Sequence, residues 1–178
     1  MKTQRGLSLI ELMIALAVAC VLFGVAVPAF SGGLEAARAS AARSDLLASL
    51  MAASTRAAIT GVRGVLCPSN DGTNCRNSPD WSDGWLVFLD SNGSRELEGG
   101  ERVLRIQPPL AGKVRLRTTV GRTRIVFQGN GGNAGSNATF TLCDGRGPAR
   151  ARALIMSNAG GLRDGRPSAE AVLATCAR

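Results

Sequence analysis

The sequence predicts an α+β protein in which one long N-terminal helix packs against antiparallel β-sheets. Two observations support this fold class. The first 60 residues hold a long apolar stretch followed by an alanine-rich segment with helical periodicity, and the remainder breaks into short apolar runs separated by Gly, Asn and Pro. Because the strands all follow the helix instead of alternating with it, the pattern indicates α+β.

The apolar stretch contains one charged residue, Glu11. The 19 residues from Leu12 to Phe30 are uncharged, and at about 1.5 Å per residue a helix of this length crosses a hydrocarbon core of about 30 Å. A carboxylate in such a segment costs about 2.5 to 3.5 kcal/mol, so we expect it to have a partner or a function. The short segment 1–6 is basic and ends in Gly6. A secretory signal would instead carry its small-residue cleavage site after the apolar core.

The next segment, 31–62, is predicted to be an amphipathic helix that continues the membrane segment and packs on a sheet. Ser31–Gly33 should loosen the helix after Pro28, and Gly61 and Gly64 should end it. Its apolar stripe recurs at three- and four-residue steps, at Leu34, Ala37, Ala41, Leu47, Leu50, Met51, Ser54 and Ala58.

Residues 63–178 are predicted to form a β-rich domain. Its expected strands are short apolar runs bounded by Gly, Asn and Pro turns. These runs are 65–67, 85–89, 103–106, 114–119, 124–127, 138–142 and 153–156.

Charge is distributed unevenly along the chain, whose formal net charge is +8. Residues 7–102 hold seven arginines and ten acidic residues, a net of −3. Residues 103–178 hold eleven arginines and one lysine against three acidic residues, a net of +9. This asymmetry indicates a polyanionic partner for the basic half, and arginine suits bidentate phosphate contacts. The alternative is a basic face that only keeps the domain soluble.

The composition argues against an enzyme. The chain has no histidine and no tyrosine, which excludes histidine-based triads and most catalytic zinc sites. We expect no catalytic residue, no cofactor and no metal. The carboxylates of Asp90 and Glu96 have a spacing faintly like a calcium loop, but the twelve-residue ligand pattern is missing and Asn92-Gly93 indicates a plain turn.

Five cysteines are present. Cys20 lies in the apolar segment, where we expect a small packing residue. The other four would lie outside the cytoplasm, where oxidation is expected, and they permit three pairings. We favour Cys67 with Cys75, which closes a Pro/Asn/Gly-rich loop, and Cys143 with Cys176, which ties the last residues to the domain. Zinc binding is the alternative, although the spacings are not C-x-x-C.

The N-terminal segment resembles the class III leader of type IV pilins and pseudopilins: a glycine, Gly6, a hydrophobic residue, Leu7, three positions and a glutamate, Glu11. In that family a prepilin peptidase cuts after the glycine and methylates the new amine. The resemblance implies that 1–6 is the leader and that 7–30 is a transmembrane and assembly helix, in which the glutamate pairs with the methylated amine. A simple membrane anchor with an incidental acid is the alternative.

Downstream residues resemble the GspH/FimT minor pilins. The resemblance implies two β-sheets beside the helix in a single-pass inner-membrane protein with a periplasmic domain, which joins other pilins in an extracellular pilus. In this family FimT-type members serve type IV pili and can bind DNA during natural transformation. GspH-type members serve type II secretion through protein contacts, which is the alternative. The matching residues are Leu66-Cys-Pro-Ser69, Cys75, Trp81-x-x-Gly84-Trp85-Leu-Val-Phe-x-Asp90, Asn92-Gly93, Arg102-Val-Leu-Arg105 and Thr141-Leu-Cys-Asp144.

Non-specific DNA binding is predicted from three arginine groups. FimT-type DNA binders carry a Gly-Arg-x-Arg motif near the C-terminus, and the corresponding Gly160-Gly-Leu-Arg163 has glycine in place of the first arginine. Gly121-Arg-Thr-Arg124 matches the motif literally at another place. The competing patch comprises Arg115, Arg117, Arg122 and Arg124, which we expect to alternate on two strands. The preferred patch combines the other two groups: Arg146, Arg150 and Arg152, and Arg163 and Arg166.

Overall fold

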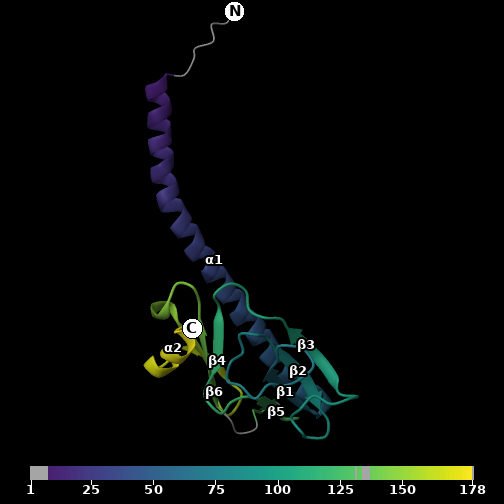
Figure 1. The fold of residues 1–178 in the computed structure, drawn as a ribbon. Helices are drawn as coiled ribbons and strands as arrows, with labels where there is room; N and C mark the ends of the chain where they lie inside the picture. Colours follow the sequence, from purple (N-terminus) through teal and green to yellow (C-terminus); the bar gives the residue numbers. More distant parts are fainter. Residues whose placement is uncertain (1–7, 131, 134–136, 178) are drawn as a thin grey trace, which may run out of the picture. The chain divides into compact units, whose positions relative to one another are not determined.

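The computed structural model describes residues 8–130, 132, 133 and 137–177. The chain divides into two compact units, residues 1–34 and 35–178, and helix α1 (Leu9–Thr60) contributes to both. In the second unit α1 is followed by two antiparallel sheets, so the predicted α+β fold is confirmed (Figure 1).

The described part of the first unit is helical and apolar. Its large hydrophobic side chains from Leu9 to Phe30, among those described, are 53–78% exposed. Within the described residues one helix, α1, is long and apolar enough to cross a membrane. Ser31–Gly33, which the sequence predicts to loosen the helix, lie inside it. Glycine costs a helix only about 1 kcal/mol, which is too little to interrupt one with long apolar and alanine-rich flanks.

The strands form two four-stranded sheets. All neighbouring strands within each sheet are antiparallel. The first sheet has the order β3-β2-β1-β5, with β1 (Arg63–Pro68), β2 (Trp85–Asp90), β3 (Arg102–Gln107) and β5 (Ile125–Phe127). The second has the order β4-β6-β7-β8, with β4 (Arg115–Thr118), β6 (Ala138–Cys143), β7 (Arg152–Met156) and β8 (Leu162–Gly165).

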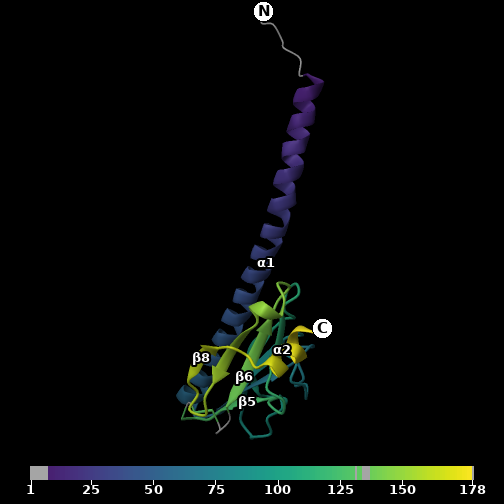
Figure 2. The same cartoon turned by 90° about the vertical axis from the view of Figure 1, so that its left-hand side faces the viewer.

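Two elements near the C-terminus are missing from the sequence prediction, strand β8 and helix α2 (Ala169–Cys176). Figure 2 shows α2 beside the second sheet, where it packs on β6 and β4. The signal for α2 is a helix start: the Ser168 hydroxyl accepts the N–H of Ala171, and Glu170 lies in the first turn. A short 3-10 helix, η1 (Pro148–Arg150), precedes β7.

The main core lies between α1 and the inner faces of both sheets. The predicted stripe on the helix is wrong in register, because Met51 is 62% exposed and Leu34 is 42% exposed. Small residues face the sheets instead, and their size lets helix and strands approach closely. The residues of α1 that are buried are Ala39, Ala42, Leu46, Ser49, Leu50, Ala53 and Ala57.

Specific contacts fix α1 against both sheets. The buried Trp85 indole donates to the Ser49 hydroxyl at 2.9 Å. Arg105 of β3 pairs with Asp45 at 2.7 Å, and Arg43 pairs with both carboxylate oxygens of an aspartate in β8, Asp164. The helix is therefore tied to an edge strand of each sheet.

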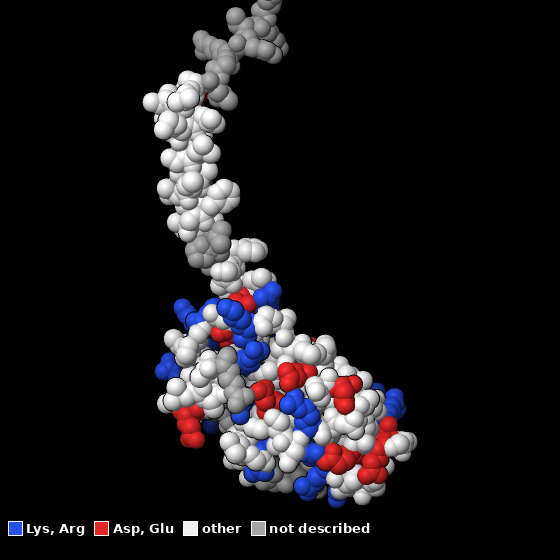
Figure 3. All heavy atoms as spheres, viewed as in Figure 1, with Lys and Arg blue, Asp and Glu red and all other residues white. Residues whose placement is uncertain are grey.

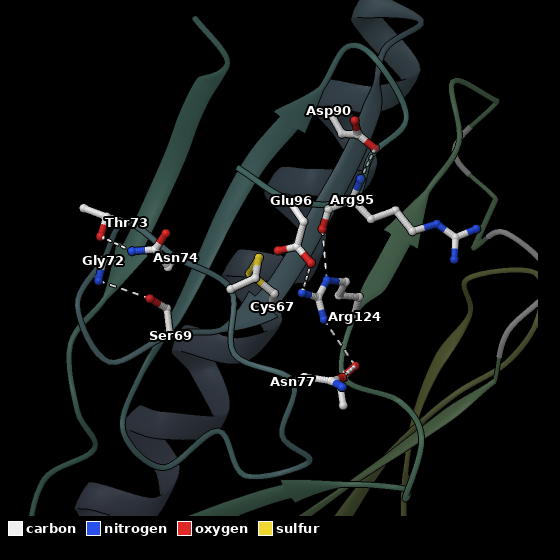
Figure 4. Close-up of a disulfide and its surroundings, with 12 residues drawn as sticks. Cys67, Ser69, Gly72, Thr73, Asn74, Asn77, Asp90, Arg95, Glu96 and Arg124 are labelled. Atoms are coloured by element: carbon white, nitrogen blue, oxygen red, sulfur yellow. Dashed lines mark hydrogen bonds and ion pairs between the residues drawn. A yellow bond between two sulfur atoms is a disulfide. The ribbon is translucent and has the colours of Figure 1, made fainter. Parts of the chain in front are cut away.

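A second, smaller core covers the outer face of the first sheet. It explains why β2 is buried along its whole length, although an antiparallel strand with one solvated face would alternate. A disulfide joins Cys67 and Cys75 there, with Cα atoms 5.4 Å apart, so the predicted pairing is confirmed. Figure 4 shows the loop that follows Cys67, in which the Gly72 N–H donates to the Ser69 hydroxyl and the Asn74 side chain donates to that of Thr73. In the same loop, hydrogen bonds from the Asn74 side chain and nearby backbone lower the pKa of the Asp71 carboxyl.

Candidate functional site

Of the three N-terminal residues that the sequence singles out, one, Glu11, lies within the described part of the chain. Gly6 and Leu7 lie outside the described residues. Glu11 lies in the first turn of α1, where its carboxylate accepts the N–H of Ser8 at 3.4 Å and its own N–H donates to the Ser8 hydroxyl at 3.3 Å. This reciprocal pair is a capping box. The Ser-x-x-Glu spacing could have revealed it in the sequence.

The second disulfide joins Cys143 at the end of β6 to Cys176 at the end of α2, with Cα atoms 5.5 Å apart. This predicted pairing is also confirmed. Among the residues of α2, Thr175 alone is buried, so the disulfide supplies much of what holds α2 to the sheet. Cys20, the remaining cysteine, is free and exposed in the first unit.

Arg146, one of the predicted DNA-binding residues, is engaged inside the domain. Its guanidinium donates to both carboxylate oxygens of Asp144, at 3.0 and 2.7 Å. The Asp144 side chain is only 3% exposed, and these hydrogen bonds lower the pKa of its carboxyl and raise the pKa of Arg146. Arg146 thus neutralises a buried charge, and removing it would leave that charge without its partner.

Glu35 holds three segments together at the start of the second unit. Its side chain is 14% exposed. It accepts the N–H of Gly145 at 3.1 Å and the guanidinium of Arg38 at 2.7 Å. A further hydrogen bond comes from the backbone of Lys113, and together these bonds, that of Gly145 foremost, lower the pKa of the Glu35 carboxyl.

The preferred arginine patch is divided between the two faces of the second sheet. Arg152 shares a face of β7 with the buried Leu154 and lines a small hollow with Arg43 of α1. Arg163 lies opposite Ile155 in the β7–β8 pairing, and it therefore projects from the other, outer face. Sequence spacing alone could not show this, because the face of each residue depends on strand register.

The outer face of the second sheet carries a groove beside α2. It measures about 400 Å³ and is lined by Arg117 and Arg166 at its margins, by Thr139 and Thr141 of β6, and by Glu170 of α2. The Arg117 guanidinium donates to a carbonyl oxygen of α2 at 3.3 Å. Two guanidinium groups and several hydroxyls can bind phosphate oxygens, while Glu170 opposes an anion at one side.

The competing patch is also divided. Arg115 and Arg117 lie on β4 in the second sheet, whereas Arg122 and Arg124 precede β5 in the first, so the expectation that the latter pair lies on a strand is wrong. Arg124 pairs with Glu96 and donates to the carbonyl oxygen of Arg95 at 3.0 Å, as Figure 4 shows.

The remaining polar candidates fold into turns. The Asp90 carboxylate, at the end of β2, accepts the N–H of Gly93 at 2.7 Å and that of Arg95 at 3.2 Å, so its buried oxygens are satisfied by the turn that follows. Within the described residues no group of three or more Cys, Asp or Glu side chains could hold a metal ion.

Basic side chains gather at one end of the second unit. In Figure 3 several Lys and Arg gather where its part of α1 begins, with a few Asp and Glu among them, and both signs of charge are mixed over the rest of the visible face. The basic half of the chain, residues 103–178, contributes the whole second sheet and α2, and it also contributes β5 and most of β3 in the first sheet.

Comparison with known proteins yields two family matches. The family model described as type II transport protein GspH matches residues 41–160, more than half of the chain. The model of the prokaryotic N-terminal methylation motif matches residues 1–27. No curated protein matches the chain significantly.

Two crystal structures of the type IV minor pilin FimU of Pseudomonas aeruginosa PAO1 have a similar fold. One is 20% identical and matches with a TM-score of 0.55 over 71% of this chain and 91% of FimU. The other, in a different crystal form, is 19% identical, with a TM-score of 0.56 over 79% of this chain and 92% of FimU. At these identities the likeness concerns the fold alone.

Proposed function

Because the chain belongs to the GspH family and its fold is similar to that of a type IV minor pilin, we propose that it is a minor pilin of a type IV pilus. It is a structural subunit, anchored in the inner membrane with its domain in the periplasm until it enters the filament. The observation that carries this proposal is the match of residues 1–27 to the methylation motif, on a helix whose apolar side chains are exposed. The similarity of its fold to that of the minor pilin FimU supports a role in a type IV pilus.

Prepilin peptidase cleaves the bond between Gly6 and Leu7 and methylates the new amine. In the filament the Glu11 carboxylate then pairs with the methylated amine of its own or a neighbouring chain, which offsets the cost of a charge in an apolar helix bundle. The capping hydrogen bonds between Glu11 and Ser8 are long, at 3.3 and 3.4 Å, and a cationic partner would compete with them effectively.

The test is to sequence the N-terminus of the mature protein and to measure its entry into pili. Glu11→Ala should be cleaved normally and fail to assemble. Ser8→Ala is the matched control, because it removes the hydroxyl that accepts the Glu11 N–H and keeps the carboxylate, so it should assemble. A mature chain that begins elsewhere than Leu7, or normal assembly of Glu11→Ala, would refute the proposal.

We further propose that the subunit binds DNA without sequence preference, as natural transformation requires. The outer face of the second sheet supports this best, because Arg163 projects from it and Arg117 and Arg166 flank its groove. Of the other predicted residues, Arg146 is engaged at Asp144 and Arg152 faces α1, while Arg150 ends the 3-10 helix η1.

Salt dependence tests DNA binding directly. Three phosphate contacts give a log–log slope of about −2.7 on duplex DNA, and removing one flattens it by about 0.9. Arg163→Ala combined with Arg166→Ala should therefore weaken binding by full-length protein in detergent and flatten the slope. Arg122→Ala combined with Arg124→Ala, which removes the literal motif, is the control. Unchanged binding in the first variant would place the site elsewhere.

The second candidate is a pseudopilin of a type II secretion system, which the description of the matching family favours. In that case the domain makes protein contacts only. Absence of DNA binding even at low salt, together with co-purification with secretion components, would support it over the pilus.

A further inference from the structure

Four basic residues lie in or beside the segments that Glu35 binds, and we name them the basic collar: Arg38, Lys113, Arg115 and Arg146. Arg115 belongs to it through a hollow that it lines with Lys113. Glu35 binds the Arg38 side chain, the Lys113 backbone and the loop at Gly145. A hollow of about 200 Å³ is lined by Lys113 and Arg115 together with that loop. Arg146 lies close enough to Glu35 for the carboxylate to raise its pKa.

The charge that the collar presents outward is positive. Its two acidic partners are nearly covered, since the side chains of Glu35 and Asp144 are 14% and 3% exposed. Arg38 and Arg146 are paired with them but remain 35% and 28% exposed. In the described structure the side chain of Lys113 has no partner, and that of Arg115 contacts only a carbonyl oxygen, of Val114.

The position of the collar along the chain indicates its partner. Phe30 ends the strongly apolar run, four further uncharged residues follow, and Glu35 is the next charged residue in the same continuous helix. Five residues of helix span about 7.5 Å, and each polar layer of a bilayer is about 5 to 7 Å thick. Residues bound to Glu35 therefore lie at the boundary between headgroups and water.

We propose that the basic collar binds the phosphate groups of anionic phospholipids at the membrane surface before the subunit enters the filament. This inference rests on the proposed membrane anchoring. Clusters of Lys and Arg next to a transmembrane helix bind anionic lipid in this way, each cation strengthening the association about fivefold. Duplex DNA is the less favoured partner, because Glu35 follows the anchored segment directly in the chain. Arg115 of the collar shares the outer face of β4 with Arg117 of the groove at α2, so the test includes DNA.

The test uses the full chain in nanodiscs of phosphatidylcholine alone or of an equal mixture with phosphatidylglycerol. Hydrogen exchange of the loops 111–113 and 144–147 is followed by mass spectrometry. The two collar cations without a carboxylate partner should slow exchange in the anionic discs by about fivefold or more, and high salt should remove the difference. Lys113→Glu combined with Arg115→Glu should also remove it.

The matched control is Arg56→Glu combined with Arg102→Glu, the same charge change at a hollow beside β3, which should keep the lipid effect. Hydrogen exchange of β6 reports whether each variant is folded. If a glutamate variant is not folded, the same positions are substituted by glutamine. Release of the chain at alkaline pH would refute the anchoring itself. If the chain is anchored but the two loops exchange equally in both lipids, the collar does not bind lipid, and only this proposal is overturned. If duplex DNA slows exchange of the loops and anionic lipid does not, the partner of the collar is nucleic acid.

Discussion

Glu35 and Asp144 each hold a loop of the domain through an ionised carboxylate. Both pKa values are lowered from their ordinary 4.5 and 3.8, by the Gly145 N–H and by Arg146 respectively. A carboxyl whose pKa is lower in the folded state binds protons more readily when unfolded, so its contribution to stability is complete above the ordinary pKa and is lost as pH falls below it. The free energy of unfolding should therefore decrease from about pH 5 downward.

Glu35→Gln tests this at one residue. The variant should lose stability at neutral pH and show a shallower decrease between about pH 5 and 3, because one titrating group has been removed. Urea unfolding of the full chain in detergent, followed by tryptophan fluorescence, measures both. Glu170→Gln, which changes an exposed carboxylate, should keep the wild-type pH dependence, and an equal change in both variants would contradict the role of Glu35.

At this scale the sequence predicts covalent partners better than surfaces. The Cys67–Cys75 and Cys143–Cys176 pairings follow from loop composition and position in the chain. The arginine patch does not, because Arg152 and Arg163 belong to neighbouring strands of one sheet and still project from opposite faces. The role of Arg146 also depends on the burial of Asp144, which a sequence does not show.

Among the elements, α1 and β1 approach unusually closely. A Cβ added at Gly64 would lie 2.5 Å from the carbonyl oxygen of Ala53, a backbone atom that cannot move aside. Gly64→Ala should therefore lower the free energy of unfolding by about 1 to 3 kcal/mol, the usual cost of overpacking. Gly99→Ala is the control, since nothing lies within 4 Å of its added Cβ. Equal stability of the two variants would show that helix and strand can separate without cost.

The same close approach explains why the stripe on α1 was predicted in the wrong register. Hydrophobicity favours Met51 and Leu34, but the helix face that can come near a glycine-containing strand is the one with Ala53 and Ala57. Strands with strong apolar runs were predictable within one or two residues. β8 and α2 were not, because β8 is short and polar and α2 buries a single residue.

The stability of the whole domain depends on its C-terminal disulfide. Cys143 and Cys176 are 33 residues apart, so the bond restricts a long segment of the unfolded chain. Cys143→Ala combined with Cys176→Ala should lower the free energy of unfolding by about 2 to 5 kcal/mol, measured by urea unfolding. Cys20→Ala, which breaks no bond, should leave it unchanged. A stable double variant would indicate that packing alone retains α2.

For the molecule as a whole, the fold class and the family were predictable because the apolar N-terminal helix and the run of strands are strong local signals. The arrangement of charged side chains in space was less predictable. Basic side chains gather at one end, where loops of the second sheet meet Glu35, a contact between residues more than a hundred positions apart.

Neither disulfide involves α1, since all four bonded cysteines lie beyond residue 60. Tension along α1 is therefore carried to the sheets by the main chain at its end and by non-covalent contacts: alanine packing and the ion pairs of Arg43 and Asp45. A load parallel to the helix axis shears these contacts together instead of peeling them one by one. A filament built on such helices would resist pulling because many weak contacts share the force, and the disulfides protect only the sheets and α2 against it.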